Sequence, residues 1–551
     1  VKRLEKEVET EEVQTLVLRG LGSMPVMQCG LISLPPDADL SGWTAQLARS
    51  VTFGNRDPDP QRWHGHLVRA VFRQGPDELP TRPDTALFVA FTASGLGKLG
   101  VPGPQDGLGL ANFLAPFYQG MSSRERVLRD GGPSKPSNWV WSDSPWTGAP
   151  MKEDAVDAVL LAYGMDADEC DTAIRDQVAR YGLKLVKSLK SPARLLMPNE
   201  LRAEPFGFAD GISNPVIKGL RGDRGLPHDR VEAGEILLGY PHNRPGKAPT
   251  CALPAELDPL DILPAVLGDA PVETSTEYTR YPAFGRESGA ASDHDFGRNG
   301  TFLVVRQLEQ DVAGFIRYTK EAARELAACP GTSWASAHWV AAKMVGRWRD
   351  GSPVVLYPEA APRSPDVTND FGYADIDPRG FACPLGSHVR RSNPRDSLIS
   401  DQPKDGSHVS SHRILRRGRS YEEQGPKDVR KTEGLIFLAA CADLERQFEF
   451  VQQTWIGDPS FHGLTGESDP AVDSDGKRQD LSLPDGRTVR RLKGIPDFVT
   501  VRGGGYFFMP SRSALHYLAY RSRRLAGTVS PPSAPGSRKR SASPSPTGGP
   551  A

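Results

Sequence analysis

The stretch CPLGSHVRRSNPRD, residues 383–396, sets one histidine among small residues and follows it with arginines. Gly386 and Ser387 precede His388, so little side-chain bulk stands beside its ring and a flat cofactor has room to approach. Arg390 and the arginines after it suit an acidic ligand, because guanidinium groups bind carboxylates through paired hydrogen bonds. A lone histidine among arginines is more often a surface residue, so the stretch alone does not establish a binding site.

Two further stretches contain charged groups that suit the same kind of site. GFADGISNP, residues 207–215, places Asp210 before a glycine, and HRILRRGRSY, residues 412–421, contains the adjacent pair Arg416 and Arg417. Asp-Gly is a common turn pair, so Asp210 taken alone is more often a turn residue. The three stretches together indicate a shared function more strongly than any one of them.

In combination these stretches resemble the dye-decolourising peroxidase family, which are haem enzymes that use hydrogen peroxide. The resemblance continues, in the family's order, through NGTFLVVRQLEQDVAGF (299–315), GLIFLAACADLERQFEFVQQTW (434–455) and FVTVRGGGYFFMPS (498–511). Two positions depart from the family's pattern: Glu422 stands where Gly is usual, and Ser387 stands where Ala is common. Neither departure removes a reacting group.

The resemblance implies an α+β fold of two fused ferredoxin-like units, each an antiparallel sheet with helices packed on it. It places an N-terminal unit at 1–215, a connecting segment at 216–298 and a C-terminal unit with the haem ligand at 299–525. The strand–helix–strand pattern over 154–189 is itself typical of such a unit. Residues 526–551 are rich in Ser, Pro and Gly and predict a disordered tail.

On the proximal side the resemblance assigns His388 as the axial ligand of the iron, a common role for a neutral imidazole. Such a histidine usually donates its other ring nitrogen to a carboxylate, which fixes the tautomer. The sequence leaves three candidates for that carboxylate: Asp443, Glu467 and Asp469.

On the peroxide side the resemblance assigns Asp210 as the base that moves a proton between the two oxygens. It assigns Arg416 as the cation that stabilises charge while the O–O bond breaks. The resemblance also favours Arg416 over Arg417, because an arginine two residues after Ile414 and two before Gly418 matches the family's pattern. Leu435 and Phe437 alternate along the next predicted strand and are expected to wall the pocket, although ordinary core packing would also explain them.

Several other residues are weaker candidates. Arg390 is expected to contact the cofactor, and His408 or His412 to bond one of its carboxylates. Trp455 and Tyr421 lie nearest the motifs and would relay electrons to bulky donors if they reached the surface. The absence of a CxxCH motif predicts haem b, held without a covalent bond.

Composition excludes several classes of protein. The 551 residues exceed one ordinary core, and the net charge of −1 gives no reason to expect nucleic acid or an anionic membrane as a partner. No run of 18 apolar residues exists, and VKRLEKEVETEEV at the start lacks the apolar core of a signal peptide. Six dispersed cysteines without CxxC predict a reducing, cytoplasmic location. His64 and His66 form WHGH, but no carboxylate or cysteine beside them completes a metal site.

The sequence therefore predicts a haem peroxidase whose partners are hydrogen peroxide and an organic reductant such as a dye or phenol. It leaves a homo-oligomer open. One rival is a haem- or porphyrin-binding protein that delivers haem or removes its iron. Another is a non-catalytic interaction protein without a cofactor, which the presence of His388, Asp210 and Arg416 disfavours.

Overall fold

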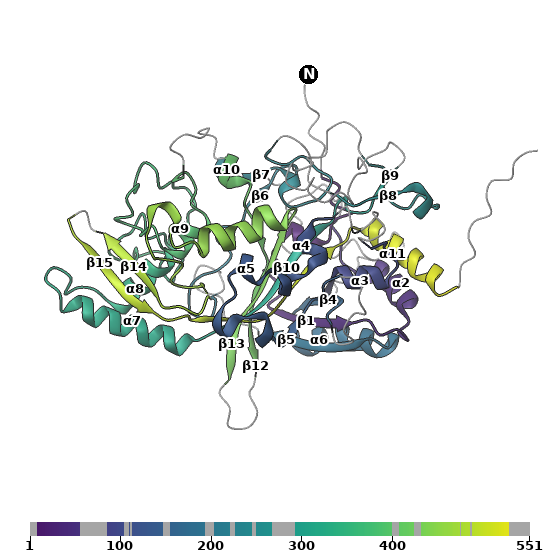
Figure 1. The fold of residues 1–551 in the computed structure, drawn as a ribbon, viewed down its shortest axis with the longest axis horizontal. Helices are drawn as coiled ribbons and strands as arrows, with labels where there is room; N and C mark the ends of the chain where they lie inside the picture. Colours follow the sequence, from purple (N-terminus) through teal and green to yellow (C-terminus); the bar gives the residue numbers. More distant parts are fainter. Residues whose placement is uncertain are drawn as a thin grey trace, which may run out of the picture.

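The computed structural model describes residues 8–54, 85–103, 110, 113–146, 155–192, 203–220, 226–244, 250–266, 293–398, 407–423, 431–473, 475–484 and 487–527. Within them, one large antiparallel sheet with helices packed on it forms the α+β fold that the sequence predicted (Figure 1). His64, His66 and the side chain of His408 lie outside the described residues. The predicted tail does too, apart from its first two residues.

The first half of the sheet follows the βαββαβ order of a ferredoxin-like unit. Its elements are β1 (Val26–Ser33), α2 (Leu40–Ser50), β2 (Thr85–Phe91), β4 (Ala158–Gly164), α6 (Ala167–Tyr181) and β5 (Lys184–Ser191). In space the strands lie in the order β2-β4-β1-β5. Asp166 caps the start of α6 by accepting the backbone N–H groups of Asp168 and Glu169, and Gly182 ends it with a φ of 65°.

The second half repeats this order. Its elements are β10 (Thr301–Gln310), α7 (Val312–Ala327), β11 (Leu415–Arg416), β12 (Arg419–Glu423), β13 (Thr432–Cys441), the π-helical turns η12 (Leu444–Glu449) and η13 (Val451–Ile456), and β16 (Val499–Met509). The strands lie in the order β11-β13-β10-β16, the same arrangement as in the first half. The two fused ferredoxin-like units are thus confirmed.

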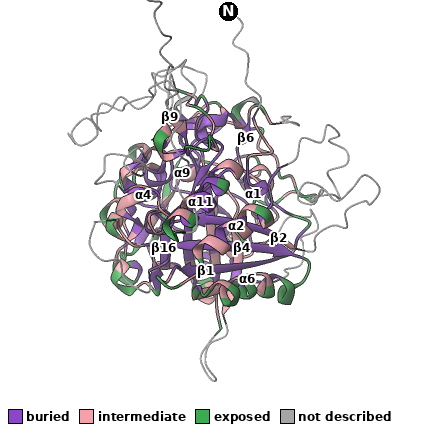
Figure 2. Ribbon diagram, turned by 90° about the vertical axis from the view of Figure 1, so that its right-hand side faces the viewer, coloured by how far each residue is buried: buried purple, intermediate pink, exposed green. Residues whose placement is uncertain are grey.

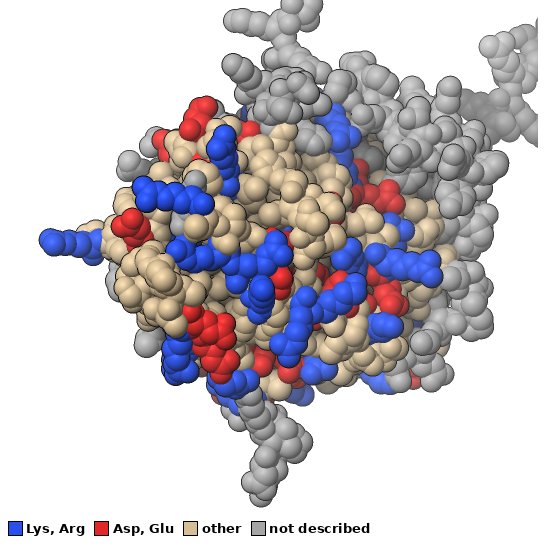
Figure 3. Space-filling view, turned by 60° about the vertical axis from the view of Figure 1, so that its left-hand side comes forward, with Lys and Arg blue, Asp and Glu red and all other residues tan. Residues whose placement is uncertain are grey.

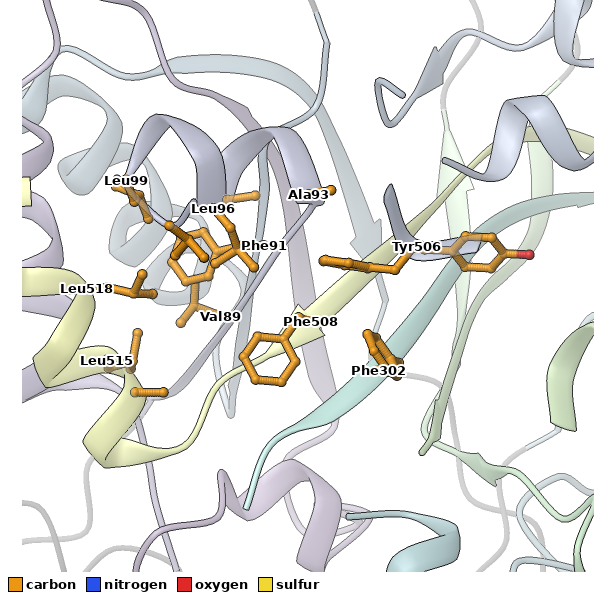
Figure 4. Close-up of a cluster of buried hydrophobic side chains, with 14 of the residues drawn as sticks. Val89, Phe91, Ala93, Leu96, Leu99, Phe302, Tyr506, Phe508, Leu515 and Leu518 are labelled. Carbon is orange, nitrogen blue, oxygen red and sulfur yellow. The ribbon is translucent and has the colours of Figure 1, made fainter. Parts of the chain in front are cut away.

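The two halves meet where β16 pairs with β2, through Phe508 opposite Phe91. β3 (Trp141–Ser142) adds a short parallel strand to β16. Figure 4 shows Phe302 and Phe508 from the second half beside Phe91 and Leu96 from the first. The strands of the junction are buried (Figure 2), so a continuous apolar core crosses it.

The last helix, α11 (Arg512–Leu525), packs on the first half of the fold although it follows the last strand of the second. The Thr44 hydroxyl of α2 lies 2.8 Å from that of Ser522, and Leu515 and Leu518 join the core that contains Trp43. The predicted boundaries of the units stay a prediction, but α11 belongs spatially with the N-terminal unit.

Shorter elements complete the described chain. The helices among them are α1 (Thr15–Leu18), α3 (Ala93–Lys98), α4 (Ala115–Gln119), α5 (Glu125–Leu128), α8 (Ala337–Val345), α9 (His388–Ser392) and α10 (Ser407–Ser410). The connecting segment contributes β6 (Val216–Ile217), β7 (Arg230–Val231), β8 (Ala252–Pro254) and β9 (Asp293–Asp295). A late polar stretch, for which no strand was predicted, contains the hairpin β14 (Gln479–Pro484) and β15 (Val489–Ile495).

The surface of the molecule mixes charges of both signs. On the face that contains α7 and the β14–β15 hairpin, Lys and Arg are interspersed with Asp and Glu (Figure 3), which agrees with the small net charge. None of the described helices has the length and apolar character that crossing a bilayer requires. All six cysteines are free thiols, and only Cys329 is exposed.

Candidate active site

His388 begins helix α9 and is held on its Nδ1 side. That atom lies 2.8 Å from Oδ2 of Asp469, a carboxylate that is buried. Oδ1 of the same carboxylate accepts the backbone N–H groups of Ala471 and Val472 at 2.9 and 3.1 Å. Burial opposes ionisation of Asp469, but the charge and hydrogen bond of His388 outweigh it and lower the pKa of the carboxyl group. Asp469 is therefore the partner among the three carboxylates considered.

The other two candidates have different contacts. Asp443 caps η12 by accepting the N–H of Arg446, and Glu467 accepts hydrogen bonds from the N–H and hydroxyl of Ser482. Nε2 of His388 has no hydrogen-bond partner among the described residues, and its side chain is 26% exposed. The imidazole therefore has one anchored nitrogen and one that is available to a ligand.

Gly386 and Ser387 beside this histidine are packed against protein. A Cβ added at Gly386 would lie 2.8 Å from Leu481 Cδ1, and the Ser387 hydroxyl donates to the carbonyl of Lys343 at 2.5 Å. The small residues thus let β14 and α8 approach α9. Gly386 therefore does not provide the room for a cofactor that the sequence predicted.

Asp210 and Arg416 lie together although they are 206 residues apart in sequence. Arg416 Nη1 is 3.5 Å from Asp210 Oδ1. The side chain of Arg416 is 36% exposed and that of Asp210 is 37% exposed. The backbone N–H of Arg416 donates to Asn214 Oδ1 at 2.9 Å, which joins the GFADGISNP loop to β11. The fold therefore brings the predicted base and the predicted cation to one place.

Arg417 faces the opposite side of β11. Its guanidinium donates to the carbonyls of Leu16 and Val17 at 2.7 and 3.0 Å, and burial lowers its pKa to about 10. Successive side chains of a strand point to opposite faces, so only one of the two arginines can stand beside Asp210. That one is Arg416.

Leu435 and Phe437 share one face of β13 and are half-buried, whereas Ile436 between them is fully buried on the other face. The ring of Phe437 lies 6.0 Å from that of Phe448 in η12. These two side chains have the alternation and the partial exposure expected of a pocket wall.

The prediction for Arg390 is corrected by its surroundings. Its side chain is 1% exposed, donates to Asp377 Oδ2 at 3.0 Å and to the Cys383 carbonyl at 2.8 Å, and lies 4.3 Å from the ring of Tyr373. A guanidinium with these partners is directed away from a ligand on His388. Arg390 stabilises the turn before α9, and Arg391 likewise binds backbone carbonyls, including those of Trp455 and Glu467.

A second cationic group consists of Arg347, which the sequence did not indicate, and Arg395, one of the arginines that follow His388. Their guanidinium carbons lie 5.6 and 4.0 Å from the centre of the Phe371 ring, and both side chains are buried. No carboxylate of the described residues lies within ion-pair distance of either. Burial, followed by the charge of Arg395, lowers the pKa of Arg347 to about 10. Arg395 has a φ of 53°, a left-handed turn that directs its side chain back toward Phe371.

Two aromatic candidates do not have the predicted placement, and the role expected of His412 stays a prediction. Tyr421 and Trp455 are 0% and 2% exposed, so neither can accept electrons from a bulky donor at the surface. The ring of His412 stacks on Phe450 at 3.9 Å, and its Nδ1 is bonded to the carbonyl of Arg446. The expectation of a surface relay at Tyr421 or Trp455 is therefore wrong.

The residues present fit a haem group. His388 offers one nitrogen while Asp469 holds the other, the arrangement of a metal-binding histidine. Arg395 Nε and both side-chain polar atoms of Asn393 are buried without a hydrogen-bond partner. Buried donors of this kind require a partner, and a carboxylate of the cofactor would supply one for the guanidinium.

The chain is similar in sequence to several peroxidases, although no family model matches it. "Multifunctional dye peroxidase DyP2" of Amycolatopsis sp. (strain ATCC 39116 / 75iv2) is 34% identical over 449 residues, 78% of this chain and 82% of that protein. "Dye-decolorizing peroxidase AauDyP1" of Auricularia auricula-judae is 27% identical over 457 residues, 79% of this chain and 76% of that protein.

Solved structures agree on the fold. The crystal structure of a fungal DyP-type peroxidase from Auricularia auricula-judae matches with a TM-score of 0.67 and 24% identity, over 94% of this chain and all of that one. The Anabaena sp. DyP-type peroxidase matches with a TM-score of 0.65 and 20% identity, over 92% of this chain and 94% of that one. With 34% identity spread over most of the Amycolatopsis protein, this chain belongs to the dye-decolourising peroxidase family.

Proposed function

We propose that His388, Asp210 and Arg416 carry the peroxidase reaction of this chain, in which hydrogen peroxide is reduced and an organic donor is oxidised. Bound haem supplies the redox chemistry, taking two electrons from the donor side for each peroxide consumed. The observation that supports the proposal most is the contact between Asp210 and Arg416, two half-exposed groups that distant motifs bring within 3.5 Å.

The proximal residues have a holding role. His388 Nε2 would ligate the iron, and Asp469 would keep the proton on Nδ1, which fixes the tautomer and makes the ligating nitrogen more basic. Arg391 fixes the segment that carries Asp469 by donating to the carbonyls of Trp455 and Glu467.

The peroxide-side residues have an acid–base and an electrostatic role. Asp210 would take a proton from one oxygen of hydrogen peroxide and return it to the other. Arg416 would stabilise the negative charge that develops between these two transfers, from a position that its bond to Asn214 fixes beforehand. Leu435 and Phe437 would keep bulk water from this side, which strengthens both interactions.

The cofactor is proposed to be haem b, held without a covalent bond because the chain has no CxxCH motif. Arg347 and Arg395 take the place of Arg390 as the partners of its carboxylates, since they are buried and have no carboxylate of the described residues as an ion-pair partner.

Arg395→Leu is expected to speed the loss of haem to apomyoglobin, because it removes one charged partner of the cofactor.

Arg390→Leu serves as the matched comparison for that measurement. It is expected to lower the midpoint of thermal unfolding, because it leaves the buried Asp377 carboxylate without its cationic partner. The loss of haem per folded molecule should stay near that of the unaltered protein. The reverse pattern would restore Arg390 to the cofactor site and remove Arg395.

Asp210→Asn is expected to slow the reaction with hydrogen peroxide but to leave haem content unchanged. The substitution keeps shape and hydrogen-bonding capacity and removes the base, which is typically worth ~10²–10⁴ in rate. The effect should fall toward the lower end, because a water beside Arg416 can relay the proton. Stopped-flow mixing that follows the Soret band measures it, and an unchanged rate would leave Asp210 as a turn residue only.

The rival function, haem delivery or iron removal, has no observation in its favour. The same peroxide mixing separates the two: a carrier would bind haem without a rapid, stoichiometric spectral change on adding peroxide. A purified protein without a Soret band after haem-supplemented expression would contradict both. The cytoplasmic location, the homo-oligomer and the unit boundaries at 215 and 299 stay predictions.

A further inference from the structure

Asn369 is a single side chain that joins three parts of the site. Its Nδ2 donates to the carbonyl of Ile212 at 2.8 Å. Its Oδ1 accepts from Arg347 Nη2 at 2.7 Å and from Arg395 Nη2 at 3.3 Å. Its own carbonyl also accepts from Arg395 Nη1 at 2.8 Å, and His228 Nε2 lies 2.9 Å from the same oxygen. Both functional groups of the amide are therefore used.

One of these contacts reaches the loop that carries the proposed base. Ile212 lies two residues after Asp210. The part of the loop before Asp210 is held by a different bond, in which the N–H of Ala209 donates to the carbonyl of Arg349 at 2.9 Å. Further upstream the Glu204 carboxylate accepts the N–H groups of Phe206 and Phe208, both at 2.9 Å. The Asn369 amide is thus a side-chain anchor on the far side of Asp210, next to the bond of Asn214 with the backbone of Arg416.

The other contacts orient cations without neutralising them. Arg347 and Arg395 lie against the same Phe371 ring, are buried, and have no carboxylate of the described chain in ion-pair range. An amide oxygen accepts hydrogen bonds from both guanidinium groups but brings no charge. The pair therefore stays positively charged and can bind an anion that is not part of the protein.

We propose that Asn369 is a positioning residue that ties the Asp210 loop to the Arg347–Arg395 pair, so that binding of an anion at the pair also steadies the loop. The inference rests on the proposed function in one respect, namely that the anion is a carboxylate of haem. An asparagine suits both tasks because it donates to the loop and accepts from the arginines. An aspartate would accept from the arginines and repel the Ile212 carbonyl.

The test is amide hydrogen exchange of residues 207–212, measured on Asn369→Ala and Asn369→Asp in haem-free and haem-loaded protein. Both variants lack the donor to Ile212, so exchange in this loop is expected to rise ~10-fold, the effect of losing about one buried hydrogen bond. Amides of β1 and β4 should keep their rates, because these strands lie in the first half of the sheet. Haem should slow the loop's exchange in the unaltered protein and have less effect in both variants.

The two variants should differ in how well they retain haem. Asn369→Asp places a carboxylate between the two guanidinium groups and offsets one of their two positive charges, so haem should pass to apomyoglobin several-fold faster than from Asn369→Ala. A residue with only a structural role would not produce this order, since the alanine removes more contacts than the aspartate does.

A matched control is Asn243→Asp. Asn243 is also half-buried and also joins two segments, by accepting the N–H of Glu232 at 3.0 Å and donating to the Ser410 hydroxyl at 2.7 Å. It should leave exchange of 207–212 and haem transfer unchanged. Loop exchange that does not change in either Asn369 variant would overturn the proposal, as would loop exchange that haem does not slow in the unaltered protein. Failure of the unaltered protein to take up haem would instead overturn the proposed function, and the haem-free exchange would still decide whether Asn369 ties the loop.

Discussion

Arg416→Leu is expected to slow the reaction with hydrogen peroxide by ~10²–10³-fold, about 2.7–4 kcal/mol in the barrier, while haem content stays near that of the unaltered protein. The backbone of Arg416 is held by the bond of its N–H to Asn214, and its guanidinium already lies beside Asp210 before peroxide arrives. A charge that is already in place costs no reorganisation when the O–O bond breaks. Stopped-flow mixing that follows the Soret band measures the rate, and absorbance per protein measures the haem content.

Two comparisons make this result specific. Arg416→Lys keeps a positive charge but loses the planar fork, so its rate should fall between those of the leucine variant and the unaltered protein. Arg417→Leu removes bonds to the carbonyls of α1 and should lower stability without slowing the reaction. An Arg416→Leu protein that reacts at the unaltered rate would remove Arg416 from the mechanism.

The choice between these two arginines shows what a sequence can supply. Adjacent strand residues point to opposite faces, so the pair Arg416–Arg417 guarantees one residue on each side of β11. The motif spacing then favours Arg416, and the structure places that residue beside Asp210. The strand order in the two halves came instead from the family resemblance, because the stretch between β2 and β4 is too long for local spacing to decide the pairing.

The cationic partners of the cofactor show where this reasoning fails. Arg390 is only two residues from His388, but a helix separates such neighbours by more than half a turn, and the side chain turns to Asp377. Arg347 lies just after α8, forty-one positions before the histidine, and no local pattern connects the two. The side chain of Arg395 points back toward Phe371 because its backbone adopts a left-handed turn. That conformation is rare outside glycine and cannot be read from the sequence.

Burial of aromatic residues was also beyond the sequence. Tyr421 lies in β12 and Trp455 lies in η13. Sequence periodicity assigns each residue to one face of its element but does not say whether other parts of the chain cover that face. The cluster of Val409, Val451 and Phe461 covers Trp455, and these residues come from three separate segments. The hairpin β14–β15 was missed for a related reason, because its many charged residues obscure the alternation of Leu481 and Leu483.

His388→Ala is expected to lose most of its bound haem, because the cofactor then keeps only pocket contacts and the bonds to its carboxylates. Loss of a group that merely orients a metal-binding histidine typically costs ~10–100-fold in affinity, and loss of the ligand itself should cost more. Asp469→Asn therefore provides an intermediate step: it keeps the imidazole but removes the charge that holds Nδ1.

The order to expect in haem affinity is thus the unaltered protein, then Asp469→Asn, then His388→Ala. His338→Ala, on the exposed face of α8, controls for loss of a histidine as such and should bind haem normally. Added imidazole should partly restore haem binding to His388→Ala, since it can occupy the space the side chain leaves and supply a nitrogen ligand. If His388→Ala keeps its haem and the absorption spectrum of nitrogen-ligated iron without imidazole, the ligand is another histidine. The bond between His388 and Asp469 would then only stabilise the fold.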